Sequence, residues 1–408
     1  KKRDIRIIMD LVINHTSDQH EWFQKSRRRI EPYTDYYIWR KGEKGKKPTN
    51  WGNFFGGDCW EYDDLRGEYY LHLFAKEQPD LNYHNEAVIE AIEEAMHFWL
   101  ERGVAGFRCD VINIIYKEAI KNGKWRPALT GSEYYLSTPG CHRVLHRLHE
   151  DVLAKYDAFT VGETVFVTPK MADDLVNPAH GELSTVFAFE HMETDCYKIK
   201  WFLRRFSPDR FFACLTKWQK ALPWNTVYLE NHDQPRSVSR FGNDTQYHDE
   251  SAKALATLVL TLRGTPFLYE GQEIGMTNFD FSDMEKVQDV ESINIWNMGK
   301  QLHLPHSLRW RMIKTKSRDN ARTPMQWDDT VNAGFTAGTP WFYVNDNYRE
   351  INVEAQEHDP DSLLNFYRRA IALRKRLPVV REGKYRDCCP LAGSLYLYTR
   401  EMKGQRLL

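Results

Sequence analysis

Short apolar runs alternate with longer stretches of helical periodicity along the 408-residue chain. The short runs have the length and composition of buried strands, and they cover residues 5–10, 104–110, 158–163, 185–189, 226–229 and 266–269. The longer stretches predict helices over residues 88–99, 141–152, 211–222, 251–261 and 363–377. Strands that alternate with helices in this way are typical of an α/β fold with a parallel sheet.

Two stretches interrupt the alternation. Residues 15–80 are rich in Trp, Tyr, Gly and charge without a clear period, which predicts a folded insertion after the first strand. Residues 278–342 form a second long excursion, and a β-like tail begins at residue 379. We therefore expect a main α/β domain over residues 1–14 and 81–377, an inserted domain over 15–80, and the start of a C-terminal β-domain over 378–408.

Composition and charge exclude several classes of protein. Lys and Arg number 56 and Asp and Glu number 57, so the formal net charge of −1 provides no field for nucleic acid or an anionic membrane. The longest apolar runs are too short to span a bilayer. The seven cysteines are odd in number and irregular in spacing, which favours reduced thiols and a cytoplasmic location.

Polar residues follow the predicted strands at their carboxyl ends, where a parallel α/β barrel holds its reactive groups. They are Asp10, Arg108 with Asp110, Glu163, and Asp233 in the sequence Asn-His-Asp. Bringing several carboxylates to one edge is electrostatically costly, so stability alone rarely selects the arrangement. This pattern predicts an active site built on carboxylates.

The surroundings of two carboxylates predict different roles. Arg108 and Asp110 are two apart on a strand, so both point to one face and the guanidinium favours an ionised, nucleophilic Asp110. Glu163 lies between Val161 and Val165 with no basic residue in the next few positions, and a dry pocket would raise its pKa, as a general acid requires. A pair of carboxyl groups in these roles is the arrangement of a retaining glycosidase.

Seven segments, in order along the chain, resemble signatures of the α-amylase family of glycoside hydrolases. Four begin at Asp10, Gly106, Val161 and Asn231, and they read DLVINH, GFRCDVIN, VGE and NHD. Three more resemble the oligo-1,6-glucosidase subgroup, namely QPDLN at 78–82, GTPFLYEGQEIGM at 264–276 and SRDNARTPMQW at 317–327. Seven segments in order are far more specific than one, so the chain is identified as a member of this family.

The resemblance implies a role for each matching residue. Asp110 would be the nucleophile, Glu163 the acid/base, and Asp233 the group that stabilises the transition state through sugar hydroxyls. The transferred glucose would be bound by His15, His232 and Arg318, while Arg108 would position Asp110. His232 and Asp233 can both reach a ligand only if their strand has already ended. Asp10 and Asn14 are expected to belong to the framework.

The resemblance also implies a (β/α)8 TIM barrel. The six predicted strands correspond to the third to eighth strands of that barrel, so the first two strands are expected to be missing. The inserted domain would follow the third strand, and the C-terminal antiparallel β-domain would be truncated at residue 408. No cofactor is required for the chemistry, and a structural calcium ion would belong to the missing N-terminal part.

The implied function is hydrolysis of terminal α-linked glucose from short oligosaccharides with retention. Val111, directly after the nucleophile, resembles the residue of family members that prefer α-1,6 linkages of the isomaltose type. Trehalose-6-phosphate hydrolase and sucrose isomerase remain alternatives within the family, and a non-catalytic glucosidase-like subunit or an inert fragment is the alternative outside it. The expected partner is a small oligosaccharide, without nucleic acid or membrane, and the oligomeric state stays open.

Three histidines at helical spacing offer a weaker signal for a metal site. His142, His146 and His149 lie at i, i+4 and i+7 of a predicted helix. Because no carboxylate stands at ligand spacing among them, we interpret them as solvent-facing residues and predict no metal site.

Overall fold

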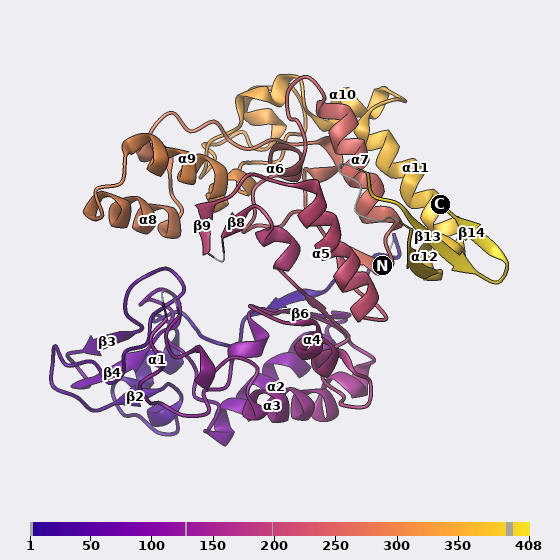
Figure 1. Ribbon diagram of the computed structural model, residues 1–408. Helices are drawn as coiled ribbons and strands as arrows, with labels where there is room; N and C mark the ends of the chain where they lie inside the picture. The colour runs from indigo at the N-terminus through magenta and orange to yellow at the C-terminus, as the bar shows by residue number, and fades with distance from the viewer. Residues whose placement is uncertain (1–2, 127–128, 198, 389–394) are drawn as a thin grey trace. The chain divides into compact units, whose positions relative to one another are not determined.

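The computed structural model describes residues 3–126, 129–197, 199–388 and 395–408 (Figure 1). The chain forms two compact units, Lys1–Phe189 and Glu190–Leu408, which we describe one after the other. Each predicted strand is present in the structure, although most are shorter than predicted.

The first unit contains a four-stranded parallel sheet. The strands occur in the order β1 (Met9–Leu11), β5 (Gly106–Cys109), β6 (Phe159–Glu163) and β7 (Thr185–Phe187), which is also their order along the chain. At Gly106 the sheet requires glycine, because its φ is +151° and a Cβ atom would lie 1.8 Å from the carbonyl oxygen of Phe159. Consecutive neighbouring strands place their carboxyl ends, and the residues that follow them, along one edge.

Helices connect the successive strands of this sheet, and Figure 1 shows them gathered on one side of it. They are α2 (Glu86–Glu101), α3 (Pro139–Asp151) and α4 (Pro169–Val176). Each begins at a side chain that accepts a hydrogen bond from a free N–H of the first turn, and these N-caps are Asn85, Thr138 and Thr168. The predicted helices 88–99 and 141–152 are thus confirmed, whereas α4 was not predicted.

The stretch after β1 folds as its own small unit around a three-stranded antiparallel sheet. Its strands are β2 (Trp39–Arg40), β4 (Glu68–Leu71) and β3 (Trp60–Asp63), in that order across the sheet, and α1 (Glu21–Ser26) precedes them. The aromatic residues that obscured any period form its core, with Trp51 and Trp60 almost fully buried.

The second unit contains a parallel pair of strands, β10 (Thr226–Val227) and β11 (Thr265–Pro266), and an antiparallel pair, β8 (Cys196–Tyr197) and β9 (Ile199–Leu203). Its helices are α5 (Pro208–Ala221), α6 (Ser237–Phe241), α7 (His248–Thr261), α8 (Val290–Gln301), α9 (His306–Lys316), α10 (Val353–His358), α11 (Leu363–Arg376) and α12 (Pro378–Glu382). The excursion over residues 278–342 therefore includes α8 and α9, which were not predicted because few of their residues are buried.

The chain ends in a three-stranded antiparallel sheet. Its strands are β12 (Lys384–Asp387), β13 (Tyr398–Met402) and β14 (Gln405–Leu407), whereas the residues just before them, expected to be β-like, form the short helix α12. Pro378 favours this helix, because it occupies a first-turn position whose N–H has no partner within a helix.

Two buried arginines tie this sheet and α11 to the end of α7. Arg374 of α11 donates to the carbonyl oxygens of Leu260 and Leu262, and Arg400 of β13 donates to the carbonyl oxygen of Thr261 at 2.6 Å. The last carbonyls of a helix have no partner within it, so the two guanidiniums cap α7. Burial and the neighbouring Arg374 lower the pKa of Arg400 to about 10.

Candidate active site

The residues singled out in the sequence occur in both units, and the structure describes them as two groups. His15, Arg108, Asp110 and Glu163 belong to the first unit, and His232, Asp233 and Arg318 belong to the second.

Arg108 organises the first group. It lies on β5 between β1 and β6, in register with Asp10 and Val161. Its Nη1 donates to Asp10 Oδ1 at 2.7 Å and to Asp110 Oδ1 at 2.6 Å, while Nη2 donates to Glu163 Oε2. Burial lowers the pKa of Arg108, but the three carboxylates outweigh burial and raise it. One guanidinium thus offsets the repulsion among carboxylates from three neighbouring strands.

The contact with Glu163 differs from the expected surroundings of that residue. The sequence places no basic residue close after Glu163, but the neighbouring strand supplies Arg108. A guanidinium stabilises the ionised form of a carboxyl group, so this contact opposes the neutral form that a general acid needs. The structure therefore places a cation, and not only apolar side chains, beside Glu163.

The backbone turns sharply directly after Asp110. Val111 has φ 36° and ψ 39°, a left-handed conformation that costs a β-branched residue about 1–2 kcal/mol. The Val111 side chain is buried in the cluster that includes Trp60 and Ile114. The cluster compensates for the strain and fixes the direction in which Asp110 leaves the strand.

His15 is held by a buried polar network. The side-chain amides of Asn14 and Gln78 contact its two ring nitrogens, at 3.2 Å and 3.0 Å. Asn14 in turn accepts from Lys117 Nζ at 2.7 Å, and Lys117 pairs with Asp80 at 2.6 Å. Burial lowers the pKa of His15 against the opposing effects of Asp80 and Asp110, so the imidazole is neutral at pH 7.

Asn14 is fully buried in this network, whereas the Asp10 side chain accepts from Arg108 and is 53% exposed. Sequence reasoning missed Lys117, although a lysine that follows the apolar sequence VINII is a signal for a buried cation.

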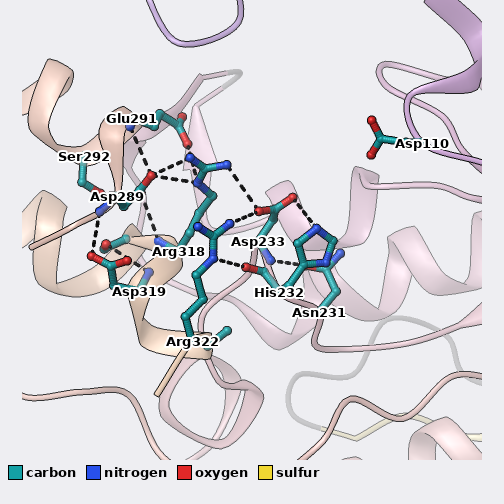
Figure 2. Close-up of polar contacts among 12 residues, drawn as sticks. Asp110, Asn231, His232, Asp233, Asp289, Glu291, Ser292, Arg318, Asp319 and Arg322 are labelled. Carbon is teal, nitrogen blue, oxygen red and sulfur yellow. Dashed lines mark hydrogen bonds and ion pairs between the residues drawn. The ribbon is translucent and has the colours of Figure 1, made fainter. Parts of the chain in front are cut away.

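Asp233 is the centre of the second group (Figure 2). Its Oδ1 accepts from Arg322 Nη2 at 2.7 Å and from Arg318 Nη1 at 3.4 Å, while Oδ2 lies 3.2 Å from His232 Nε2. Burial raises the pKa of Asp233, but His232, Arg318 and Arg322 outweigh burial and lower it. The group therefore presents an ionised carboxylate among donors, suited to binding hydroxyl groups.

His232 and Asp233 occupy a turn rather than a strand. β10 ends at Val227, and the backbone N–H of Asp233 donates to Asn231 Oδ1 at 2.8 Å within the turn. The condition set by the sequence, that the strand must have ended for both side chains to share a ligand, is therefore met.

Arg318 is fixed by a second, deeper carboxylate. Its Nε and Nη2 donate to Asp289 Oδ1 at 2.8 Å and 2.7 Å, as Figure 2 shows. Asp289 is also the N-cap of α8 and accepts from Ser292 Oγ at 2.7 Å. Burial raises the pKa of Asp289, but Arg318 outweighs burial, and the pKa is lowered to about 2.

Asp289 and Arg322 were not identified from the sequence. Arg322 stands four positions after Arg318 in the recognised SRDNARTPMQW segment, a spacing that favours a shared partner. Asp289 precedes an unpredicted helix, and its only local signal is that aspartate is a preferred N-cap.

The pKa of Asp289 predicts a stability change in acid. A lowered pKa in the folded state contributes stability above the unfolded value of 3.8, and this is lost as the pH falls towards about 2. The loss from this residue should be about 2 kcal/mol. Urea unfolding between pH 6 and pH 3 should therefore show a shallower pH dependence for Asp289→Asn than for the unsubstituted protein. Equal slopes would contradict the assignment.

Two of the three histidines of α3 contact protein groups through a ring nitrogen. His142 contacts Glu182 at 2.9 Å, and this hydrogen bond raises the pKa of His142 against burial, while His146 contacts the carbonyl oxygen of His180 at 2.7 Å. His142 is therefore partly buried rather than simply solvent-facing. Among the described residues, no group of three or more His, Cys, Asp or Glu side chains could hold a metal ion.

The cysteines were expected to be reduced, and no segment was expected to span a membrane. Six cysteines are free, of which five are buried and Cys388 is exposed, and Cys389 lies outside the described residues. No helix in the described part of the chain combines the length and apolar character needed to cross a membrane.

Comparison with known proteins relates the whole chain to one family. Residues 1–383 match the family described as alpha amylase, catalytic domain. The oligo-1,6-glucosidase of Parageobacillus thermoglucosidasius is 48% identical over 418 residues, which span 100% of this chain and 74% of that protein.

Solved structures of related enzymes have the same fold as this chain. Isomaltulose synthase from Klebsiella sp. LX3 is similar with a TM-score of 0.96 at 40% identity, and trehalose-6-phosphate hydrolase of Bacillus licheniformis with a TM-score of 0.91 at 42% identity. Each alignment covers 99% of this chain and 74% of the other.

Proposed function

Because the chain belongs to the α-amylase family of glycoside hydrolases, we propose that it is a retaining exo-α-glucosidase that releases terminal α-linked glucose from short oligosaccharides. The carrying observation is that Asp110 and Glu163 both bind the guanidinium of Arg108. The shared guanidinium limits how far apart the two carboxylates can lie, which supports the separation of about 5 Å in retaining enzymes over the wider spacing of inverting enzymes, which leaves room for a water molecule.

In the proposed mechanism, Asp110 attacks the anomeric carbon of the terminal glucose while Glu163 protonates the departing oxygen. Glu163 then removes a proton from the water that releases glucose from Asp110. Arg108 holds the carboxylates of Asp110 and Glu163 in place for these steps.

The other selected residues are proposed to bind the transferred glucose. Asp233 accepts hydrogen bonds from its hydroxyls, with the strongest interaction in the distorted transition state. Arg318 and His232 supply donors to the same sugar, and His15 binds it by exchanging its contact with Gln78 for a sugar hydroxyl. No step of this mechanism requires a cofactor.

The proposed architecture is a (β/α)8 barrel over residues 1–14 and 81–377, with an inserted domain over 15–80 and a C-terminal β-domain from 378. The parallel order β1-β5-β6-β7 with helical connections supports the barrel, and the antiparallel sheets after β1 and after α12 support the other two domains. The free thiols support a cytoplasmic location.

The substrate preference is tested with a linkage panel of isomaltose, maltose, sucrose, trehalose and trehalose-6-phosphate. We propose isomaltose as the best of these, supported by the 48% identity to an oligo-1,6-glucosidase. Preference for trehalose-6-phosphate, or conversion of sucrose to an isomer, would instead favour the activities named for two similar structures.

Val111→Thr should shift the preference from isomaltose towards maltose by about 1–3 kcal/mol, or one to two powers of ten in the ratio of kcat/KM values. Threonine keeps the β-branch in the left-handed turn, but its hydroxyl must find a partner inside an apolar cluster next to Asp110. The matched control is Val144→Thr, which introduces the same hydroxyl at a buried position of α3. A maltose preference in the unsubstituted protein would refute the linkage assignment.

A further inference from the structure

A buried triad of charges lies in the second unit behind the turn of Asp233. Asp195, between β7 and β8, accepts from Arg240 of α6 through both carboxylate oxygens at 2.8 Å each. Asp195 Oδ1 also accepts from Lys316 Nζ at 2.6 Å. The three side chains are 7%, 3% and 1% exposed for Asp195, Arg240 and Lys316.

Each cation of the triad is close to a residue of the second group. Arg240 Nη1 donates to Gln234 Oε1 at 2.6 Å, and Gln234 directly follows Asp233. Lys316 is the last residue of α9, two positions before Arg318. Asp195 is therefore the common anchor of two segments whose anchored residues, Arg240 and Lys316, are 76 positions apart in sequence.

Burying these three charged side chains between the segments costs free energy. The triad holds two cations and one carboxylate, with Glu193 close enough to interact with both cations, and burial and Arg240 lower the pKa of Lys316 to about 8. Apolar residues of similar size would pack the same elements at least as well. Apolar side chains could not fix the orientation of a hydrogen-bond donor. The Arg240 guanidinium, bound by both carboxylate oxygens of Asp195, has a fixed orientation and directs Nη1 at Gln234.

We propose that Asp195 is a positioning residue for the second group, holding the Asp233 turn through Arg240 and the Arg318 segment through Lys316. The proposal rests on the proposed function only in the role given to Asp233 and Arg318. Asp195 contacts no substrate and acts through its two cations.

The test compares Asp195→Asn with Asp195→Asn/Lys316→Met. The asparagine variant should lower kcat for 4-nitrophenyl α-glucoside by about 10- to 100-fold, the range that applies to groups that orient metal ligands, with a smaller change in KM. The double variant removes the lysine that would otherwise be buried without its carboxylate, so it should be more resistant to urea than the single variant. Its kcat should nevertheless stay low, because the anchor is still absent.

Recovery of kcat to the unsubstituted value in the double variant would overturn the proposal, since the loss would then come from charge burial alone. The matched control is Asp280→Asn. It breaks the exposed ion pair between Asp280 and Lys314, a lysine of α9 like Lys316, and should leave kcat unchanged. All assays are made well below the unfolding midpoint of each variant.

A second readout does not depend on catalysis. The ring resonances of His232, which contacts Asp233 at 3.2 Å, should shift in NMR spectra of Asp195→Asn and remain in place in Asp280→Asn. Unchanged His232 resonances in Asp195→Asn would overturn the positioning role. A wild-type protein that is inactive on every glucoside, but shows the His232 shift on substitution, would refute the proposed function and leave the positioning role intact.

Discussion

Glu163→Gln should slow the hydrolysis of isomaltose by about two to four powers of ten, the range expected for loss of a general acid. A sugar alkoxide leaves poorly without a proton, whereas fluoride or nitrophenolate needs little protonation. The first step on such activated glucosides should therefore survive, and the glucosyl intermediate on Asp110 should accumulate because no base activates water. Burst kinetics and intact-protein mass spectrometry measure this outcome.

Rescue by azide distinguishes the role of Glu163 from that of Asp110. Azide needs no general base, so it should restore turnover of Glu163→Gln and release an α-glucosyl azide. Asp110→Asn, the control with the same change of carboxylate to amide, should give no such product because it forms no covalent intermediate. Near-normal hydrolysis of isomaltose by Glu163→Gln, or the absence of the α-azide, would show that the roles are wrongly assigned.

Asp80→Asn should reduce the free energy of unfolding by about 3–5 kcal/mol, the cost of leaving a buried charge without its partner. Asp80 and Lys117 are 0% and 1% exposed, and their charged atoms lie 2.6 Å apart. Lys117 also holds Asn14, which contacts His15, so the remaining folded protein should lose affinity for glucose as well. Urea unfolding and inhibition by glucose measure the two effects.

Two comparisons make the result specific to the buried pair. Asp64→Asn breaks a pair with the same 2.6 Å separation, but its side chains are 75% and 65% exposed, so it should change stability by less than about 1 kcal/mol. Asp80→Asn/Lys117→Met removes both charges and should be more stable than Asp80→Asn alone. Equal free energies of unfolding for the three variants would show that burial of the Asp80–Lys117 pair does not affect stability.

The sequence predicts the strands and the position of Asp110 well because both depend on local order. A short apolar run that ends in a carboxylate is visible without knowledge of its neighbours, and Asp110 follows β5 as expected. Residues that act across strands are less visible. The contact between Arg108 and Glu163 joins positions 55 residues apart, and the sequence around Glu163 contains no signal that predicts it.

The second group shows the same limit more strongly. Asp233 and Arg318 are found through motif segments, but Asp289 anchors Arg318 from a helix whose buried face is too small to give a clear period. Its importance arises from burial beside a guanidinium, a property of the folded chain alone. Lys117 is comparable, since its partners Asn14 and Asp80 come from two distant loops.

The arginines that cap α7 also determine how the C-terminal sheet can open. If β13 separated from the rest of its unit, Arg400 would leave the carbonyl oxygens of Thr261 and Gly383 without donors in a protein interior. Such an opening must therefore expose the end of α7 to water at the same time. The sheet and the last turn of α7 accordingly form one cooperative unit of local unfolding, in which strands at the end of the chain protect a helix more than 120 residues earlier.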